Sequence, residues 1–129
     1  MNKFLKFLFA FVVLAMLGAS VLQLFFPSYM ASHSGYEFSV GWQREIGIWN
    51  LAVLIMIAAV TLKYDWFYLR MILLSLITGG AGIGTNHLIN FIDSHSLINA
   101  IGAIENYLLV LGWILGWAIE NHTRKNNPI

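Results

Sequence analysis

Four apolar segments constrain the fold of this chain more than any other feature of its sequence. Each has about the 17–25 residues that a helix needs to cross a hydrocarbon core of about 30 Å, at about 1.5 Å per residue. The segments are residues 7–26, 46–62, 66–84 and 97–119. They predict an all-α integral membrane protein whose fold is a four-helix bundle.

The composition agrees with a membrane protein. Hydrophobic residues make up 59% of the 129 residues, charged residues only 10%, and the mean hydropathy is +0.73. Soluble domains carry about 25% charged residues, so this chain has too little polar surface for a water-soluble monomer of its size. The net charge of +1 argues against nucleic-acid binding, and the absence of cysteine excludes disulfides and thiolate metal sites. We expect one membrane domain over residues 1–129, with helices at about 4–26, 43–63, 66–90 and 97–120.

The first apolar segment also fits a signal peptide. Lys3 and Lys6 precede an apolar run, and the small residues 18–20 resemble a cleavage site. The apolar run continues to Phe26, however, which is longer than a typical signal core. We therefore expect a retained helix.

The basic residues predict the orientation. With four crossings, the N-terminus, the turn at residues 63–65 and the C-terminus share one side of the membrane, and the other side holds only Arg44. The positive-inside rule then places both termini in the cytoplasm, in a bacterial inner (plasma) membrane. Tyr64 and Trp66 would be aromatic anchors at the inner interface. The basic residues on the inner side are Lys3, Lys6, Lys63, Arg70, Arg124 and Lys125.

Glu105 is an ionisable residue inside the last apolar segment. Such a group is costly in a bilayer, so it usually faces a partner or a cavity. It belongs to a stripe with three- and four-residue steps, so we expect it on the packed side of its helix. Gly112 and Gly116 would allow close approach of another helix, or of a second copy in a homo-oligomer. The stripe comprises Gly102, Glu105, Leu109, Gly112 and Gly116.

The third segment carries a matching stripe of small residues. Residues 66–90 and 97–120 are therefore the expected closest helix pair. The glycine-rich run at residues 79–85 lacks a preceding strand and the Gly-Lys-Ser/Thr ending of a phosphate loop. It predicts close packing or a local helix break. The stripe comprises Ser75, Gly79, Gly82 and Asn86.

Polar side chains gather at the outer ends of the expected helices. We expect a pocket open to the outer side, which binds a small or lipophilic ligand, with a quinone as one candidate, or a partner subunit. Arg44 would contact an anion or carbonyl, and Glu105 would be a buried acceptor or proton carrier. A second interpretation is a structural polar network, which intramembrane contacts commonly form. The candidate binding residues are Arg44, Glu45, Asn50, Asn86, His87, Glu105 and Asn106.

A metal site is an alternative for part of this set. Glu45, His87 and Glu105 are two carboxylates and one imidazole, which suit zinc, iron or manganese. No two of them have a diagnostic spacing within one helix. The alternatives to a non-enzymatic binding protein are thus a metal-dependent membrane enzyme or metal carrier, and an oligomerising structural subunit. The sequence assigns no cofactor.

One short motif carries a resemblance. Gln43, Arg44, Glu45 and Gly47, followed by Asn50, resemble a Gln-Arg-Glu-x-Gly pattern of uncharacterised small bacterial inner-membrane proteins. Their four-helix layout is similar to that of the DoxX-like group, some of whose members are associated with quinone-linked respiratory enzymes. The resemblance implies a four-helix architecture. It carries no catalytic residue over to this chain.

Overall fold

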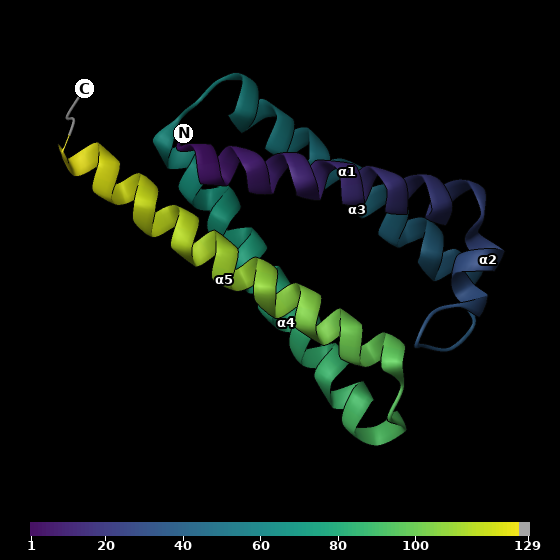
Figure 1. Cartoon of the computed structure of the whole chain (residues 1–129). Coiled ribbons are helices and arrows are strands. Elements are labelled where there is room, and N and C mark those ends of the chain that lie inside the picture. Colours follow the sequence, from purple (N-terminus) through teal and green to yellow (C-terminus); the bar gives the residue numbers. More distant parts are fainter. Residues whose placement is uncertain (127–129) are drawn as a thin grey trace. The chain divides into compact units, whose positions relative to one another are not determined.

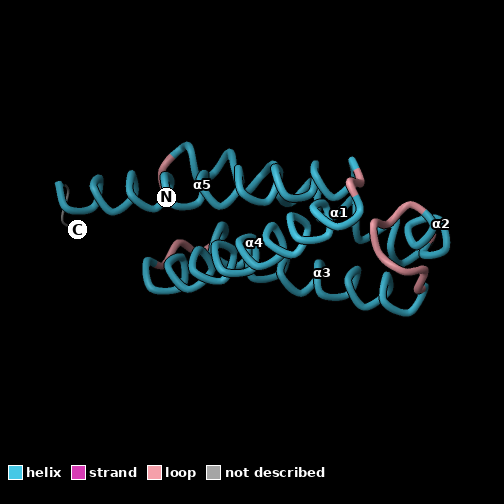
Figure 2. Tube along the Cα trace, turned by 90° about the horizontal axis from the view of Figure 1, so that it is seen from below, coloured by secondary structure: helices cyan, strands magenta, loops and turns pink. Residues whose placement is uncertain are grey.

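The computed structural model describes residues 1–126, and within that part all regular structure is helical (Figure 2). The all-α class is therefore confirmed. Four of the five helices in these residues are long and apolar enough to cross a membrane, as expected for a multi-pass membrane protein. The helices are α1 (Lys3–Phe25), α2 (Pro27–Ser32), α3 (Val40–Leu62), α4 (Trp66–Ser94) and α5 (Leu97–Asn126) (Figure 1).

Side-chain caps explain where α3 and α4 begin. The Ser39 hydroxyl accepts a hydrogen bond from the Trp42 backbone N–H at 3.2 Å, so α3 starts three residues before the expected position. The Asp65 carboxylate accepts from the N–H groups of Phe67 and Tyr68, at 2.8 and 3.1 Å. Helix α4 ends at Ser94, four residues past the expected end at residue 90, and the next residue, His95, has a left-handed backbone with φ 54°.

The ends of α1 and α5 differ in how well the sequence predicts them. Pro27 ends α1 at Phe25, as expected, and then occupies the first turn of α2, where proline costs no hydrogen bond. Helix α5 continues to Asn126, past the predicted end at residue 120. Residues 121–126 contain no glycine or proline, and the basic residues of the last turn favour the negative end of the helix dipole. The rest of the predicted polar tail lies outside the described residues.

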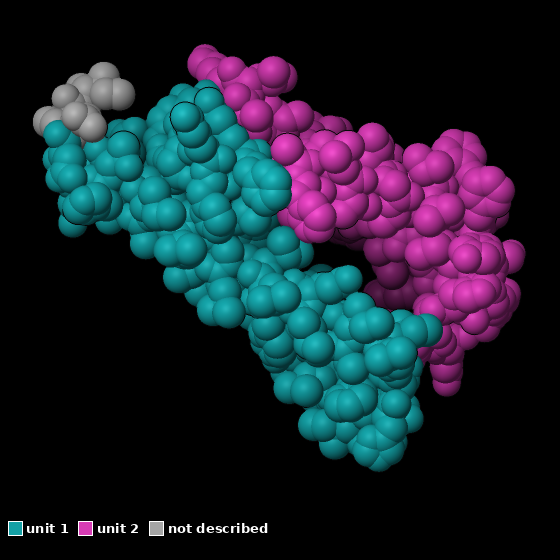
Figure 3. All heavy atoms as spheres, in the orientation of Figure 1, with its two compact units in different colours: residues 1–8, 64–129 teal, residues 9–63 magenta. Residues whose placement is uncertain are grey.

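The chain forms two compact units (Figure 3). Unit 1 comprises residues 1–8 and 64–129, and unit 2 comprises residues 9–63. In unit 1, α4 and α5 run antiparallel and side by side, joined by a short turn (Figure 1). The expectation that these two helices are the closest pair is therefore confirmed. The buried apolar side chains of unit 1 are Leu5, Leu69, Leu73, Ala103 and Trp113.

In unit 2, α2 packs against α3, and a polar contact joins α1 to α3. The Asn50 amide donates a hydrogen bond to Gln23 Oε1 at 3.0 Å. One turn away, a Cβ on Gly47 would lie 2.9 Å from Leu24 Cγ, so glycine allows the two helices to approach. Asn50 thus has a structural partner within its own unit.

The glycine-rich run of α4 is continuous helix, so the close-packing alternative is confirmed and the helix break is not formed. The predicted stripe was wrong by one residue, however. Gly79 and Gly82 have nothing within 4 Å of an added Cβ. Gly80 and Gly84 instead face α5, where an added Cβ would lie 2.9 Å from Val110 Cγ2 and 3.2 Å from Asn106 Cβ. Both sets of positions contain glycines with helical spacing, so the sequence alone could not identify which set faces α5.

Many large apolar side chains of the long helices are exposed. Leu14 and Ile55 are each 72% exposed, and Leu108 is 63% exposed. Such surfaces are unfavourable in water but ordinary against lipid, because the bilayer is itself an apolar solvent. The exposed surface therefore agrees with helices that cross a membrane.

Candidate functional site

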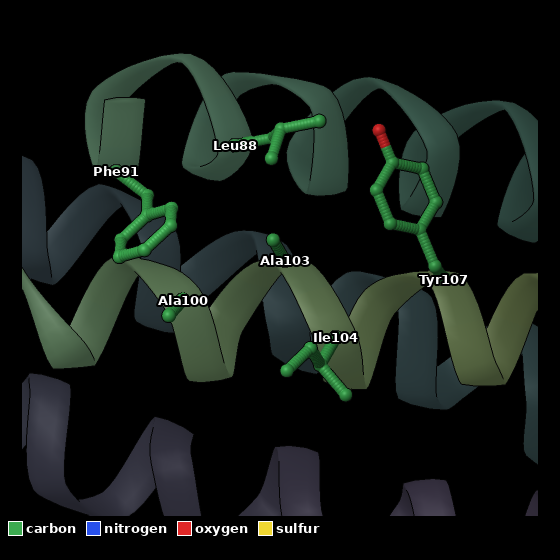
Figure 4. Close-up of a pocket in the computed structure, with 6 residues that line it drawn as sticks. All are labelled: Leu88, Phe91, Ala100, Ala103, Ile104 and Tyr107. Carbon is green, nitrogen blue, oxygen red and sulfur yellow. The ribbon is translucent and has the colours of Figure 1, made fainter. Parts of the chain in front are cut away.

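An apolar cavity of about 170 Å³ lies between α4 and α5 of unit 1 (Figure 4). Two of its lining residues come from α4 and four from α5. Helix α5 contributes two small alanine side chains to the lining, and α4 contributes the larger side chains of Leu88 and Phe91. The lining residues are Leu88, Phe91, Ala100, Ala103, Ile104 and Tyr107.

One lining residue also forms a hydrogen bond between the two helices. Tyr107 lines the cavity, and its hydroxyl points across to α4 (Figure 4). There it lies 3.0 Å from the Thr85 hydroxyl. Both hydroxyls can donate and accept, so the pair has hydrogen-bonding capacity beyond the bond between them. The lining of the cavity is nonetheless almost entirely apolar, since Thr85 does not belong to it.

A second polar pair links the same two helices. His87 Nδ1 is 3.1 Å from Asn99 Oδ1, which links α4 to α5 near their connecting turn. Asn99 is only 1% exposed, and its Nδ2 has no hydrogen-bond partner among the described residues. Leu88 and Ala100, which directly follow these two residues in the chain, line the cavity. The pair thus lies at neighbouring chain positions to two lining residues, but neither His87 nor Asn99 itself lines the cavity.

Gly102 provides the space for the His87 ring. A Cβ at position 102 would lie 2.9 Å from three atoms of that ring, closer than real Cβ contacts. The ring therefore fits over the α5 backbone only because residue 102 is glycine. This contact fixes the position of His87 relative to Asn99.

Glu105 does not lie where the sequence predicted it. Its side chain is exposed, so the expectation that it faces the packed side of its helix was wrong. Helix α5 contacts α4 through a neighbouring face, which includes Gly102, Asn106 and Val110. Glu105 shares a side with Gly112 and Gly116, as predicted, because the three residues are separated by steps of seven and four. Leu8 and Leu5 pack on the two glycines, whereas Glu105 is exposed. It has no hydrogen bond or ion pair within the described part of unit 1.

The other predicted site residues divide between the two units. Arg44, Glu45 and Asn50 belong to unit 2, whereas Asn86, His87, Glu105 and Asn106 belong to unit 1. Their convergence on one pocket stays a prediction. Two asparagines of unit 1 have local roles: Asn106 donates to the Gly102 carbonyl of its own helix at 2.8 Å, and Asn86 accepts from Asn90. Arg44 and Glu45 are exposed.

The metal alternative gains no support from the side-chain positions. Across residues 1–126, no three His, Cys, Asp or Glu side chains are grouped so that they could hold a metal ion. His87 lies over Gly102 on the α4 side of α5, whereas Glu105 is exposed on another side of that helix. Glu45 belongs to the other unit.

The sequence interpretation overlooked a buried carboxylate, Glu120. Its side chain is 4% exposed. Its Oε2 accepts from the Asn2 backbone N–H, its Oε1 accepts from the Tyr64 hydroxyl at 2.7 Å, and the Met1 amino group lies 3.5 Å away. Glu120 continues the stripe of Gly112 and Gly116 by one more four-residue step, which is the signal that could have identified it.

Tyr64 connects this carboxylate to a basic residue. Arg124 Nη1 donates to the Tyr64 hydroxyl at 3.1 Å. Burial raises the pKa of Tyr64, and its hydrogen bond to Glu120 raises this pKa further because ionisation would place two negative groups together. The phenol is therefore neutral at physiological pH and acts as a donor to Glu120.

Side chains of α1 pack against Gly112 and Gly116, the two small residues predicted to contact another helix. An added Cβ on Gly112 would lie 3.1 Å from Leu8 Cδ1, and one on Gly116 would overlap the Leu5 side chain. The first turns of α1 therefore pack on the glycine side of α5 in unit 1. Homo-oligomer formation through these glycines stays a prediction.

Comparisons of the chain with protein-family models, with curated proteins and with solved structures found no match. The resemblance to the DoxX-like layout also stays a prediction. Function is therefore argued from the chemistry of the site alone.

Proposed function

We propose that this protein is a multi-pass protein of the bacterial inner membrane that binds a lipophilic small molecule between α4 and α5. The observation that carries the proposal is the apolar cavity lined by residues from both helices. A cavity inside a membrane-spanning helix pair is accessible to molecules that partition into lipid. Sites between bundled helices are common places for such ligands.

The size of the cavity limits the part of the ligand that it can hold. An engineered cavity of about 150 Å³ in another protein binds benzene, so about 170 Å³ suits a single six-membered ring. A longer ligand would insert its ring and leave its chain among the lipids. A benzoquinone head group with an isoprenoid or alkyl tail has this form.

The polar side chain in the lining favours a ligand that has a hydrogen-bond acceptor. Tyr107 is the lining residue with a polar side chain, and its hydroxyl can donate a hydrogen bond to a ligand carbonyl. A quinone carbonyl oxygen beside the ring can accept such a hydrogen bond while the ring itself contacts the apolar lining.

The orientation is part of the same proposal. Both termini are cytoplasmic, because the ends of α1, α4 and α5 near residues 3, 66 and 126 carry most of the basic residues. The cavity then lies toward the outer leaflet, near the turn between α4 and α5. Fusion of a reporter that is active only in the periplasm, at either terminus, tests this orientation: activity at either terminus contradicts it.

The binding claim is tested with decylubiquinone as the probe. Purified protein in detergent is titrated with the probe, and bound quinone is measured after removal of free ligand. We expect saturable binding near one equivalent. Ile104→Trp should weaken it at least tenfold, because Ile104 lines the cavity and is 59% exposed, so a larger side chain can enter the cavity without disturbing the core.

A matched control is available on the same helix. Ile114 is 49% exposed and does not line the cavity, so Ile114→Trp should bind decylubiquinone like the unmodified protein. Equal binding by both variants, or non-saturable uptake proportional to detergent, contradicts the proposed function.

A second candidate function is assembly with a partner subunit, and the exposure of Glu105 favours it. An ionisable group on the surface of a membrane-spanning helix needs a polar or cationic partner, and unit 1 supplies none among its described residues. Native mass spectrometry of the protein extracted in nanodiscs tests this function. A stoichiometric second subunit that is lost in Glu105→Gln supports it. A monomeric species with no bound protein contradicts it.

A further inference from the structure

Two arginine side chains lie against one tryptophan ring at the other end of unit 1. The guanidinium carbon of Arg70 is 5.4 Å from the centroid of the Trp66 ring, and that of Arg124 is 5.2 Å from the same centroid. Trp66 and Arg70 belong to the first turns of α4, and Arg124 belongs to the last turn of α5. The ends of two helices therefore bring two permanent positive charges to a single indole.

Neither arginine has a carboxylate partner. Within residues 1–126, no Asp or Glu oxygen lies within 4 Å of either guanidinium, and Arg70 Nε is buried without an acceptor. Arg124 donates only to the neutral Tyr64 hydroxyl. The face of an indole ring attracts cations, but it does not neutralise two charges that repel each other. An anion is the group that would compensate both.

The acidic side chains at this end form hydrogen bonds or ion pairs with groups other than the two arginines. Asp65 caps α4 through the N–H groups of Phe67 and Tyr68. Glu120 accepts from the Asn2 N–H and from Tyr64, and it pairs with the Met1 amino group. The remaining charges of the same unit at this end are basic, namely Lys3, Lys6 and Lys125. The local excess of positive charge is thus available to a group outside the chain.

We propose that Arg70 and Arg124, held by Trp66, bind the phosphate group of an anionic phospholipid. A guanidinium is planar and presents paired N–H donors that match phosphate oxygens. Basic sites at the cytoplasmic ends of membrane helices commonly bind acidic head groups. This phosphate site lies at the opposite end of the α4–α5 pair from the apolar cavity, so it is independent of the proposed quinone site.

The surface beside the phosphate site favours a lipid over free phosphate. Leu74 lies one helical turn beyond Arg70, on the same side of α4, and it is 44% exposed. Phe67 and Met71 are also exposed on this part of α4. A head-group phosphate on the arginines would therefore have apolar helix surface next to it for its acyl chains.

Native mass spectrometry of the full chain in detergent tests the proposal. The probes are phosphatidylglycerol and phosphatidylcholine with identical acyl chains. We expect phosphatidylglycerol to bind at least fivefold more tightly. Arg70→Gln and Arg124→Gln should each weaken it about fivefold, the usual contribution of one basic residue near a membrane surface. Among residues 1–126, Arg70 has no hydrogen-bond partner to lose, so Arg70→Gln remains informative if Arg124→Gln misfolds.

The control is Lys125→Gln, which removes one positive charge from an exposed position next to Arg124. It should leave binding of phosphatidylglycerol within twofold of that of the unmodified chain. Equal losses for Lys125→Gln and the arginine variants, or equal binding of the two lipids, would overturn the proposal. Inorganic phosphate at matched ionic strength should displace no more lipid than chloride does. Displacement by inorganic phosphate, with binding of that ion alone, would overturn the lipid assignment.

Discussion

The His87 ring lies against Gly102, so that a Cβ at position 102 would be 2.9 Å from three ring atoms. This close approach links the structure of the helix pair to its candidate site. The same ring is hydrogen-bonded to Asn99, whose Nδ2 is buried without a partner among the described residues. Gly102 of α5, which has no side chain, thus leaves the space that the His87 ring of α4 occupies.

Substitution Gly102→Ala should therefore lower the free energy of unfolding by about 1–3 kcal/mol, because the added methyl group overpacks the contact with His87. Equilibrium unfolding in mixed detergent micelles, followed by circular dichroism, measures this effect. The control is Gly82→Ala, since nothing lies within 4 Å of its added Cβ. That variant should be neutral or slightly more stable, because alanine favours helix over glycine. Equal stabilities for the two variants would contradict the contact.

Replacement of Glu120 by alanine should destabilise unit 1 by about 3 kcal/mol, because the buried N–H of Asn2 and the Tyr64 hydroxyl lose their charged acceptor. The same unfolding measurement applies. Glu105→Gln provides the comparison, since Glu105 is exposed and has no partner within its unit, and it should change stability by less than about 0.5 kcal/mol. A larger loss for Glu105→Gln than for Glu120→Ala would reverse our assignment of the structural carboxylate.

The raised pKa of Tyr64 predicts a pH dependence. Its phenol has a higher pKa in the folded chain than in the unfolded chain, where it is about 10. The stabilisation by this group is therefore complete below pH of about 10, and it is lost as the pH rises through the folded value. Melting temperatures of the unmodified chain and Tyr64→Phe should differ most at pH 8 and converge toward pH 11. A constant difference across this range would contradict the raised pKa.

The packing of α1 on α5 predicts an energetic coupling between Gly116 and Leu5. Gly116→Ala should destabilise the protein, because its methyl group would overlap the buried Leu5 side chain. Leu5→Ala should cost about 2–5 kcal/mol by creating a cavity. In the double variant the new methyl group occupies part of that cavity, so the combined loss should be smaller than the sum by about 0.5 kcal/mol or more. Strict additivity would mean that the two residues do not touch.

The helices could be predicted from the sequence because their causes are local. Apolar runs of membrane length, the Asp65 cap and Pro27 each act within a few residues of their own position. The pairing of α4 with α5 was also predictable, since small residues and a short turn favour it. The end of α5 was predicted six residues too early, because polar residues after 120 were interpreted as a tail although nothing there breaks a helix.

The faces of the helices were harder to predict, because several stripes fit the same residues. On α4, Gly79 and Gly82 define one stripe and Gly80 and Gly84 another, and only packing against α5 distinguishes them. The sequence predicted a buried carboxylate at Glu105, because this residue is a charge in an apolar segment. The structure instead buries Glu120. Its partners, Asn2 and Tyr64, are 118 and 56 residues away in the chain, a separation at which periodicity carries no information.

The central claim is that a lipophilic ring occupies the cavity between α4 and α5. The most direct test is nuclear magnetic resonance of protein with labelled Leu, Ile and Ala methyl groups, in the presence of decylubiquinone. We predict intermolecular Overhauser effects from the methoxy and methyl protons of the quinone head group to the methyl groups of Leu88, Ala103 and Ile104, and none to that of Ile114. Contacts of equal strength at Ile114, or none at the lining residues, would contradict the claim.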